Sequence, residues 1–526
     1  MNRNSRDTQG TQRRLFEEGT GREGPVQGGV LETPLDGREE LPAEARQVRT
    51  DDAQACYREE RVEHWDAVAR SLGGRRGLGR GYHRRLARVY QGLVPSGRRV
   101  LEVGCGDGDL LAALRPAFGV GVDFSREMLQ RAAIRHPHLH YVLADAHDLS
   151  GVQGEFDAVI LSDLANDVWD VQGVLQEVAR LTNRRTRVIV NSYSHLWELP
   201  LSIAARLRWT KPNLPQNWLT ADDIVNLLHL TGFEVIRRWR EVLWPVSTPL
   251  LAGLCNRFLV RFWPFSHLAL SNFVVARFPG RRRRGEPEPV VSVVVPARNE
   301  AGNIASILAR TPEMGGGTEL IFVEGGSADD TYGAVEREMA NYPERRSTLL
   351  RQTGQGKGDA VRLGFSRSRG DVLMILDADL TVPPEDLPRF YRALLTGKGE
   401  FINGVRLVYP MEQGAMRFVN LVANKLFSLA FSWLLGQPVK DTLCGTKVLW
   451  KADYEAIAAN RSYFGDFDPF GDFDLLFGAA KLNLRMADLP IRYRDRTYGA
   501  TSIRRWRHGW MLLKMVFFAA MRLKFV

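Results

Sequence analysis

Apolar and polar positions alternate in two separate stretches of the chain, and each stretch predicts strands alternating with helices. In the first stretch, short apolar runs are typical of buried parallel strands, and amphipathic patterns lie between several of them. The runs lie at 100–103, 119–123, 141–144, 157–161, 187–191, 233–239 and 272–278. Helical patterns occupy 125–135 and 171–181, and Thr220 with Asp223 forms a capping-box start for another helix. The pattern predicts a doubly wound, Rossmann-like α/β domain with a seven-stranded sheet.

The alternation restarts near residue 290 and predicts a second α/β domain. Strand patterns lie at 291–295, 319–323 and 371–376, and helical patterns at 303–309, 331–339 and 359–366. The pattern then changes, and long apolar helices are predicted at 417–435 and 506–526. In the first of these helices the polar residues recur every four positions and leave a wide apolar face. They are Asn420, Asn424, Ser428 and Ser432.

Two polar breaks suggest the domain boundaries. Residues up to about Asp52 are rich in Gly, Arg, Glu and Gln and predict a disordered tail. Proline, glycine and consecutive charges exclude a packed element at 279–289. We therefore expect a tail at 1–55, a first domain at 56–280, a linker at 281–289 and a second domain at 290–526. The run 281–284 could bind nucleic acid, but a solvated linker is the favoured interpretation.

Charge is concentrated at the C-terminal end. The 526 residues carry a formal net charge of +10, and 492–526 holds nine Lys or Arg against the single acid Asp495. Such an end favours an anionic partner, which could be a phosphate group, a lipid head group or nucleic acid. Because these cations are interleaved with apolar residues, we expect a membrane surface and no nucleic acid.

The predicted location is the cytoplasm, at the inner face of the plasma membrane. The four cysteines are isolated, which fits a reducing compartment, and the N-terminus shows no secretory signal. A membrane span needs about 20 clean apolar residues, and Lys514, Arg522 and Lys524 interrupt the last helix. We therefore expect amphipathic helices that lie in the membrane surface without crossing it. Ordinary core packing of these helices is the alternative.

The first candidate site follows the strand at 100–103. Gly104-x-Gly106-x-Gly108 permits a tight turn and a close approach of the backbone to a ligand. The third glycine of the dinucleotide fingerprint is missing, which argues against NAD and for S-adenosylmethionine. Glu102 offers a carboxylate to this cationic cofactor. Asp123 is placed to hold ribose hydroxyls and Asp145 to meet the adenine.

The ordered segments 100–109, 121–125 and 156–163 resemble the class I S-adenosylmethionine-dependent methyltransferases, over about residues 56–280. The alternative is that the glycines merely turn the chain and Asp123 caps a strand. Four polar residues follow the strands where a catalytic group is needed, although each is more often a satisfied polar residue than a base. They are Asp163, Asn166, Asp167 and His195.

The second candidate site combines four segments. Two strand–turn–helix starts lie at 293–304 and 320–331, and the glycine-rich turn 354–360 makes Lys357 available for phosphate. Asp377-Ala-Asp379 projects carboxylates from a strand end. A divalent cation held there can bridge a diphosphate and neutralise charge as a nucleoside diphosphate leaves.

In this order the segments resemble inverting family-two glycosyltransferases, and among them the polyprenyl-phosphate (dolichol-phosphate-like) sugar synthases, which have a GT-A fold. The resemblance extends from about residue 290 to the C-terminus. It implies that Asp377 and Asp379 serve sugar and Mg²⁺ or Mn²⁺, with Asp379 the stronger metal ligand. The implied nucleotide-sugar residues are Pro296, Arg298, Glu300, Glu324 and Lys357, together with Asp377 and Asp379. The implied acceptor-phosphate residues are Arg406, Lys447, Arg496 and Ser502.

Asp474 is the candidate general base, with Asp472 second. A base is needed only for a sugar hydroxyl acceptor, because a lipid phosphate is already an anion. Two positions depart from the family pattern: Glu324-Gly-Gly-Ser327 replaces Asp-Asp-Gly-Ser, and Thr381 stands where close relatives often have Gln.

Taken together, the two sites predict a bifunctional transferase in one glycolipid or envelope pathway. It would move a sugar from a nucleotide-sugar to a lipid phosphate or glycan acceptor, and methyl from S-adenosylmethionine. Three alternatives remain: a glycosyltransferase whose first domain only binds the cofactor, a non-enzymatic scaffold, and an enzyme of nucleic-acid modification.

Overall fold

The computed structural model describes residues 43–71, 80–206, 214–279, 285–406, 408, 418–461, 472–494, 496, 498 and 505–525. Contacts divide the chain after Ala55, and Cys56–Val526 forms one compact unit. Helix α1, Ala43–Ser71, begins inside the stretch that was expected to be a disordered tail. Its Ala, Arg, Gln and Glu residues are good helix formers, which explains the difference.

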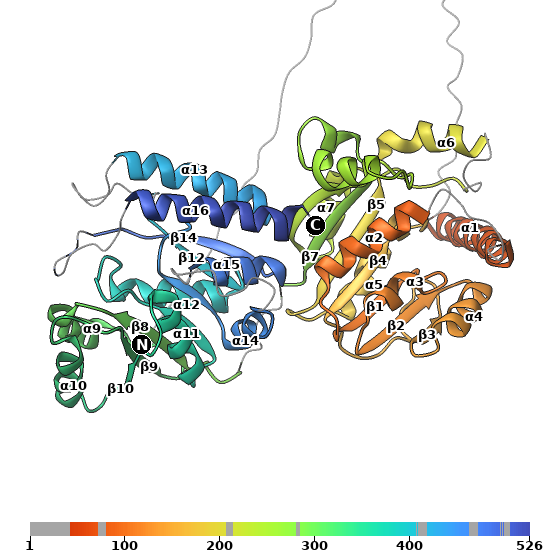
Figure 1. Cartoon of the computed structure of the whole chain (residues 1–526). Coiled ribbons are helices and arrows are strands. Elements are labelled where there is room, and N and C mark those ends of the chain that lie inside the picture. Colours follow the sequence, from red (N-terminus) through yellow and green to blue (C-terminus); the bar gives the residue numbers. More distant parts are fainter. Residues whose placement is uncertain are drawn as a thin grey trace, which may run out of the picture. The chain divides into compact units, whose positions relative to one another are not determined.

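The first sheet has seven strands in the order β3-β2-β1-β4-β5-β7-β6 (Figure 1). Only β7 runs antiparallel to its neighbours. The order reverses between β1 and β4, and this is where doubly wound sheets bind ligands. The strands are β1 Arg99–Val103, β2 Phe118–Asp123, β3 His140–Leu143, β4 Ala158–Ser162, β5 Arg187–Tyr193, β6 Glu234–Glu241 and β7 Ser271–Arg277. The predicted Rossmann-like sheet is confirmed.

Helices connect these strands, and their starts follow the capping chemistry of the sequence. The Ser125 hydroxyl accepts a hydrogen bond from the Met128 N–H at the start of α4, and Thr220 and Asp223 form the predicted capping box at α7. The helices are α2 Arg80–Leu93, α3 Asp109–Ala113, α4 Arg126–Arg135, α5 Val171–Arg180, α6 Glu198–Arg206 and α7 Ala221–Leu230. Short helical turns link β6 to β7: α8 Leu251–Gly253, η3 Leu254–Phe258, η4 Leu259–Arg261 and η5 Phe265–Leu268.

The second sheet also has seven strands, in the order β10-β9-β8-β11-β13-β12-β14. Strand β13 runs antiparallel to β11 and β12, and the other pairs are parallel. The strands are β8 Val291–Ala297, β9 Thr318–Glu324, β10 Arg346–Arg351, β11 Val372–Ile375, β12 Phe401–Val405, β13 Lys447–Trp450 and β14 Met486–Pro490. Their helices are α9 Ile304–Arg310, α10 Thr331–Asn341, α11 Lys357–Arg367, α12 Leu387–Leu395, α14 Lys451–Ala459 and α15 Asp472–Lys481. This second α/β domain has the expected GT-A-like architecture.

The two long apolar helices run side by side (Figure 1). They are α13, Phe418–Leu435, and α16, Arg505–Ala519, which continues into the π-helical turn η9, Ala520–Lys524. Leu434 of α13 and Met515 of α16 are buried in the same core as α15. None of the helices in the described parts of the chain combines the length and the apolar character needed to cross a membrane.

Candidate active sites

The glycine turn after β1 has the geometry of a ligand-binding loop. Gly104, Gly106 and Gly108 have φ of 74°, 52° and 75°, in the left-handed region that favours glycine. A Cβ at Gly104 or Gly108 would come within 2.8 Å of a neighbouring side-chain atom, whereas nothing lies within 4 Å of one at Gly106. The backbone is therefore open at the middle glycine, where a ligand could approach.

Glu102 lies on β1 directly before this turn. Its side chain is 2% exposed, and its Oε2 atom is buried without a hydrogen-bond partner. Burial raises the pKa of Glu102 well above its usual value. A buried carboxylate oxygen without a partner fits a cationic ligand, which would compensate its charge.

Asp123 ends the neighbouring strand β2 and holds the turn. Its carboxylate accepts the N–H groups of Gly106, at 2.8 Å, and of Ser125, at 2.9 Å. Burial raises the pKa of Asp123 to about 6, although both hydrogen bonds oppose the shift.

Asp145 follows β3 and is held by His147. Its Oδ1 accepts from the His147 N–H at 2.9 Å and lies 2.7 Å from the ring Nδ1. The Asp170 N–H donates to the His147 Nε2 at 3.1 Å, so we assign the ring proton to Nδ1. Burial acts to raise the pKa of Asp145, but the bonds from His147 outweigh it and hold the pKa below its usual value.

Asp163 follows β4 and joins a buried polar network from distant elements. Its carboxylate accepts the Tyr82 hydroxyl of α2 at 2.8 Å and the Asn191 Nδ2 of β5 at 2.5 Å. The Tyr90 hydroxyl in turn donates to the Asn191 Oδ1 at 2.6 Å. Burial raises the pKa of Asp163 to about 7, within the range that suits a general base. Asp163 was a candidate from the sequence, whereas its partners were not.

The other three candidates in this domain have different surroundings. The Asn166 Oδ1 accepts from the Tyr193 N–H at 2.9 Å, and Asp167 accepts from Arg61 and Trp65 of α1 at 3.0 and 2.6 Å. These bonds support the loops around the site. His195 is exposed.

In the second domain, Lys357 and Asp377 form an ion pair. The Lys357 Nζ lies 2.5 Å from the Asp377 Oδ1, where α11 begins and β11 has just ended. Burial acts to raise the pKa of Asp377, but Lys357 outweighs it and lowers the pKa. A Cβ on Gly445 would overlap both the Asp377 carboxylate and the Lys357 Nζ. Gly445, which the fold brings here from the loop before β13, was not among the predicted site residues.

Arg496 connects two further candidates. Its Nη1 lies 3.0 Å from the Glu300 Oε1 and its Nη2 lies 2.7 Å from the Asp379 Oδ2. The other oxygen of Asp379 accepts the Thr381 hydroxyl at 2.8 Å. Burial raises the pKa of Glu300 to about 7, against the opposing effect of Arg496.

The two acidic residues fit a divalent cation that a substrate completes. Within the described ranges, no three His, Cys, Asp or Glu side chains converge as a ready metal site. Mg²⁺ is commonly held by one or two carboxylates together with substrate phosphates, so a site at Asp377 and Asp379 would need no third protein ligand.

The predicted nucleotide-side residues come from the carboxyl ends of two adjacent parallel strands. Ala297 of β8 is in register with Glu324 of β9, which places Pro296 and Arg298 near that edge. The Glu324 Oε1 accepts the Ser327 N–H at 2.6 Å and so orders the Gly-Gly turn. Arg298 is exposed.

The residues assigned to the acceptor are in contrasting environments. Arg406 binds Asp441 through two hydrogen bonds, at 2.7 and 2.8 Å, and Lys447 is fully buried and donates to the Cys444 carbonyl. Arg496 is the more accessible cation, with 29% of its side chain exposed. Ser502 lies outside the described residues.

Asp474 and Asp472 both belong to α15. The Asp474 Oδ2 lies 3.0 Å from the Arg461 Nε, and the residue is 8% exposed. Asp472 is the first residue of the helix, and its side chain lies outside the described part of the chain.

Two segments of the chain match family models. Residues 292–452 match the model of glycosyl transferase family 2, and residues 100–185 match the model of a methyltransferase domain. A glycosyltransferase domain and a methyltransferase domain are therefore both present in this chain.

Curated relatives align with the glycosyltransferase part. The chain is 27% identical to glycosyltransferase AglJ of Haloferax volcanii over 216 residues, which is 41% of this chain and 66% of that protein. It is 32% identical to undecaprenyl-phosphate 4-deoxy-4-formamido-L-arabinose transferase of Pseudomonas aeruginosa over 179 residues, 33% of this chain and 51% of that protein. The chain thus spans about half to just under two thirds of these relatives' lengths.

A solved structure is also similar. Glucosyl-3-phosphoglycerate synthase from Mycobacterium tuberculosis, in complex with Mn²⁺, uridine-diphosphate-glucose and phosphoglyceric acid, is 21% identical. The similarity covers 45% of this chain and 80% of that chain, with a TM-score of 0.34.

Proposed function

We propose that this chain is a bifunctional transferase that moves a sugar from a nucleotide-sugar to a lipid phosphate or glycan acceptor and methyl from S-adenosylmethionine. The observation that carries the proposal is the presence of carboxylates at the carboxyl ends of parallel strands in each of two separate sheets. We propose 56–280 as the methyltransferase domain, 281–289 as the linker and 290–526 as the glycosyltransferase domain.

In the methyltransferase domain, the open backbone at Gly106 would admit the cofactor, between the flanking glycines Gly104 and Gly108. Glu102 would compensate its positive charge, Asp123 would bind its ribose hydroxyls and Asp145 would meet its adenine. Asp163 is the candidate base for the methyl acceptor, because its raised pKa places the carboxyl near neutrality.

In the glycosyltransferase domain, Asp379, assisted by Asp377, would hold Mg²⁺ or Mn²⁺, which would neutralise charge on the departing diphosphate. Lys357, Pro296, Arg298, Glu300 and Glu324 would line the nucleotide-sugar. Arg496, now bound by Glu300 and Asp379, would become available to phosphate when a cation occupies the carboxylates.

The acceptor assignment draws on the relatives. The name of the Pseudomonas relative identifies undecaprenyl phosphate as its acceptor, and a phosphate anion needs no general base. Asp474, with Asp472 second, would act as a base only on a sugar hydroxyl. Arg406 and Lys447 would support the acceptor phosphate from beneath, since both are largely buried, and Ser502 remains a sequence-based assignment.

A lipid acceptor also favours attachment to the membrane surface. Helix α16 buries one face yet leaves Trp510 63% and Phe517 70% exposed. Apolar insertion together with basic residues is the usual basis of interfacial binding. We propose a peripheral location at the inner face of the plasma membrane.

The test is a transfer assay in vesicles that contain polyprenyl phosphate, with a panel of nucleotide-sugars and deuterium-labelled S-adenosylmethionine. Mass spectrometry of the lipids should show a sugar added only with Mg²⁺ or Mn²⁺, and a labelled methyl group on lipid or glycan. Asp379→Ala should abolish sugar transfer, whereas Asp386→Ala, which removes a partly exposed acid paired with Arg389, should not. Absence of sugar transfer from every donor would refute the proposal. Sugar transfer without a labelled methyl group on any acceptor would favour the alternative in which the first domain binds the cofactor only as a regulator.

A further inference from the structure

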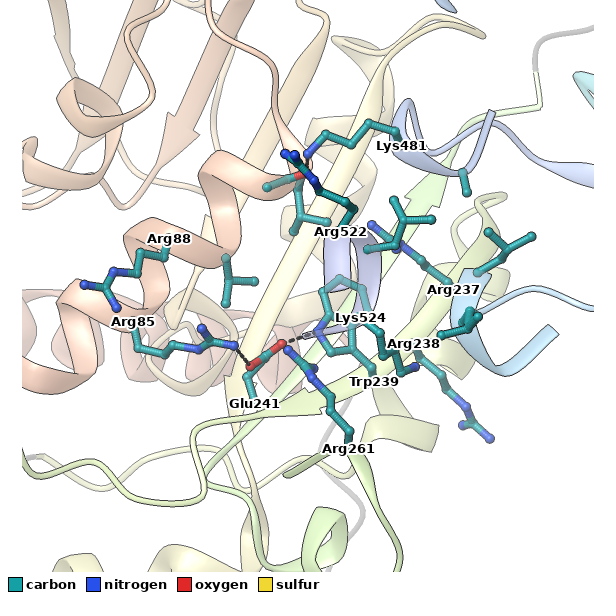
Figure 2. Close-up of a pocket in the computed structure, with 18 residues that line it drawn as sticks. Arg85, Arg88, Arg237, Arg238, Trp239, Glu241, Arg261, Lys481, Arg522 and Lys524 are labelled. Carbon is teal, nitrogen blue, oxygen red and sulfur yellow. Dashed lines mark hydrogen bonds and ion pairs between the residues drawn. The ribbon is translucent and has the colours of Figure 1, made fainter. Parts of the chain in front are cut away.

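A cationic pocket is lined by residues of both α/β domains. It is formed by α2, β6, η4, the end of α13, the end of α15 and η9, and its volume is about 100 Å³ (Figure 2). Eight of its lining residues are Lys or Arg and one, Glu241, is an acid. None of the residues assigned above to a donor or a cofactor lines it.

The one carboxylate that lines this pocket, Glu241, already has three partners. Glu241 lies 3.0 Å from the Arg85 Nη2 and 2.6 Å from the Arg261 Nη1, and accepts the Trp239 Nε1–H at 3.0 Å (Figure 2). The Nε atoms of Arg237 and Arg261 are buried without a hydrogen-bond partner. The pocket therefore holds an excess of positive charge and unused donors.

The two lysines of the pocket have lowered pKa values. Burial, and then the charge of Arg237, lower the pKa of Lys481 to about 8. Burial, followed by Arg261 and Arg237, lowers the pKa of Lys524 to about 8, although Glu241 opposes the shift. Neighbouring like charges are destabilising, and a bound anion would relieve them.

An aromatic cluster lies next to the pocket, in contact with Lys524. Directly after Arg261, Phe262 stacks on Trp433 of α13, with ring centroids 5.7 Å apart. Phe525 lies 6.0 Å from each of these rings. Lys524, which lines the pocket, has its Nζ 5.0 Å from the centre of the Trp433 ring.

Further exposed apolar residues lie in both domains. Leu250, directly before α8, is 92% exposed, and Trp263, between η4 and η5, is 79% exposed. The exposed apolar residues of the two long helices recur every three or four positions, so each set forms one stripe. They are Val422, Leu426, Leu429 and Trp433 on α13, and Trp510, Leu513, Phe517 and Met521 on α16 and η9.

We propose that the pocket binds the phosphate of an anionic lipid head group while the α8–η5 segment inserts into the same bilayer. Exposed apolar residues next to a cationic site match the two layers of a membrane surface, namely acyl chains and phosphates. The inference rests on the proposed membrane location and adds a lipid-binding site that includes the methyltransferase domain. On helix α2, Tyr82 donates a hydrogen bond to Asp163. Arg85, one turn later on the same helix, lines the pocket and pairs with Glu241. The lipid would thus lie beside the methyltransferase site.

The test compares charge-matched double variants of the full chain. Arg88→Gln/Arg522→Gln removes two exposed pocket cations, and Arg367→Gln/Arg369→Gln removes two exposed cations of the second domain away from the pocket. Flotation uses phosphatidylcholine vesicles with and without phosphatidic acid. We expect the pocket variant to lose at least tenfold in affinity for phosphatidic acid vesicles and the control to change less than twofold. Equal losses in both variants, or none in the pocket variant, would overturn the proposal.

A second pair of variants tests the insertion. Trp263→Ser should weaken binding to both kinds of vesicle by about tenfold, whereas Ile134→Ser, which changes an 82% exposed apolar residue of α4, should leave it unchanged. The proposal would also be overturned if a short RNA displaced the protein from phosphatidic acid vesicles and bound it with the same affinity as the vesicles do. Metal-stimulated donor hydrolysis without vesicles is measured on every variant. If only the lipid-binding inference is wrong, this donor hydrolysis persists. If the proposed glycosyltransferase function is wrong, the hydrolysis is absent from every variant and from the wild type.

Discussion

Asp163 occupies a backbone conformation that few residues other than glycine adopt, with φ 56°. This conformation aims its carboxylate into a network with Tyr82 and Asn191, where burial raises its pKa to about 7. A carboxyl with a raised pKa binds its proton more tightly in the folded state than in the unfolded chain. Its contribution to stability is therefore fully present below about pH 4 and is lost as the pH rises through about 7.

This linkage can be measured with Asp163→Asn, which cannot titrate. We expect the difference in free energy of unfolding, wild type minus variant, to fall between pH 5 and pH 8. Urea unfolding at both pH values gives this difference. A difference that is constant or rises with pH would contradict a raised pKa of Asp163 in the folded state.

Gly445 gives a second prediction for a single residue. A Cβ there would overlap the Asp377 carboxylate and the Lys357 Nζ, so Gly445→Ala should displace this pair and reduce metal-stimulated donor turnover at least tenfold. Gly151→Ala, where nothing lies within 4 Å of the added Cβ, is the matched control. Turnover equal in the two variants would mean that Asp377 and Lys357 need not keep this geometry.

At the scale of single residues, the sequence predicted the acidic strand ends but not their partners. The apolar runs predict strands, and four of the acids lie in or directly after such runs, so their position at strand ends could be predicted. They are Glu102, Asp123, Asp377 and Asp379. Gly445 and the Arg496 bridge depend on contacts between distant segments, and no local pattern signals such contacts.

At the scale of elements, α16 has two distinct faces. Leu512, Met515 and Ala519 are buried in the core of the second domain, whereas Leu513 and Phe517 are exposed by 52% and 70%. Core packing and an exposed apolar stripe therefore coexist in one helix, so deleting the helix would damage the core. Point variants on each face separate the two roles.

We expect Leu513→Ser/Phe517→Ser to weaken vesicle binding by at least tenfold, because burying each side chain in a membrane contributes about 2 kcal/mol. The same variant should keep its melting temperature. Met515→Ala, on the buried face, should instead lower stability by about 2 kcal/mol or more. Vesicle binding unchanged in the first variant would contradict a membrane role for α16.

Strands that form uninterrupted apolar runs were predicted well, whereas four strands of the second sheet were missed. All seven runs of the first sheet were found. In the second sheet, β10 is partly exposed, β12 contains Asn403 and Gly404, β13 is a buried run of four residues that begins with Lys447, and β14 ends in Pro490. Asn, Gly and Pro disfavour strands, and pairing with neighbours in the sheet overrides this local preference.

At the scale of the whole molecule, buried charges connect the two sheets. Glu400, which precedes β12, lies 2.8 Å from Arg187 of β5 and 3.4 Å from Arg277 of β7, and all three are largely buried. Removing one member of such a cluster leaves uncompensated buried charge and costs about 3–5 kcal/mol.

Glu400→Gln should therefore lower the free energy of unfolding by about 3 kcal/mol. The control Glu385→Gln breaks a more exposed pair with Arg310, which should cost less than about 1 kcal/mol. Urea unfolding measures both values, and similar costs in the two variants would mean that the Glu400 cluster does not stabilise the contact between the sheets.

The central claim is that one chain holds two independent donor sites. The most direct measurement titrates S-adenosylmethionine by calorimetry and follows metal-stimulated donor turnover in the same preparations of wild type, Asp123→Asn and Asp379→Ala. We predict that Asp123→Asn loses at least tenfold in cofactor affinity and keeps donor turnover, and that Asp379→Ala does the reverse. A wild-type chain that neither binds the cofactor nor turns over any activated sugar with Mg²⁺ or Mn²⁺ would contradict the claim.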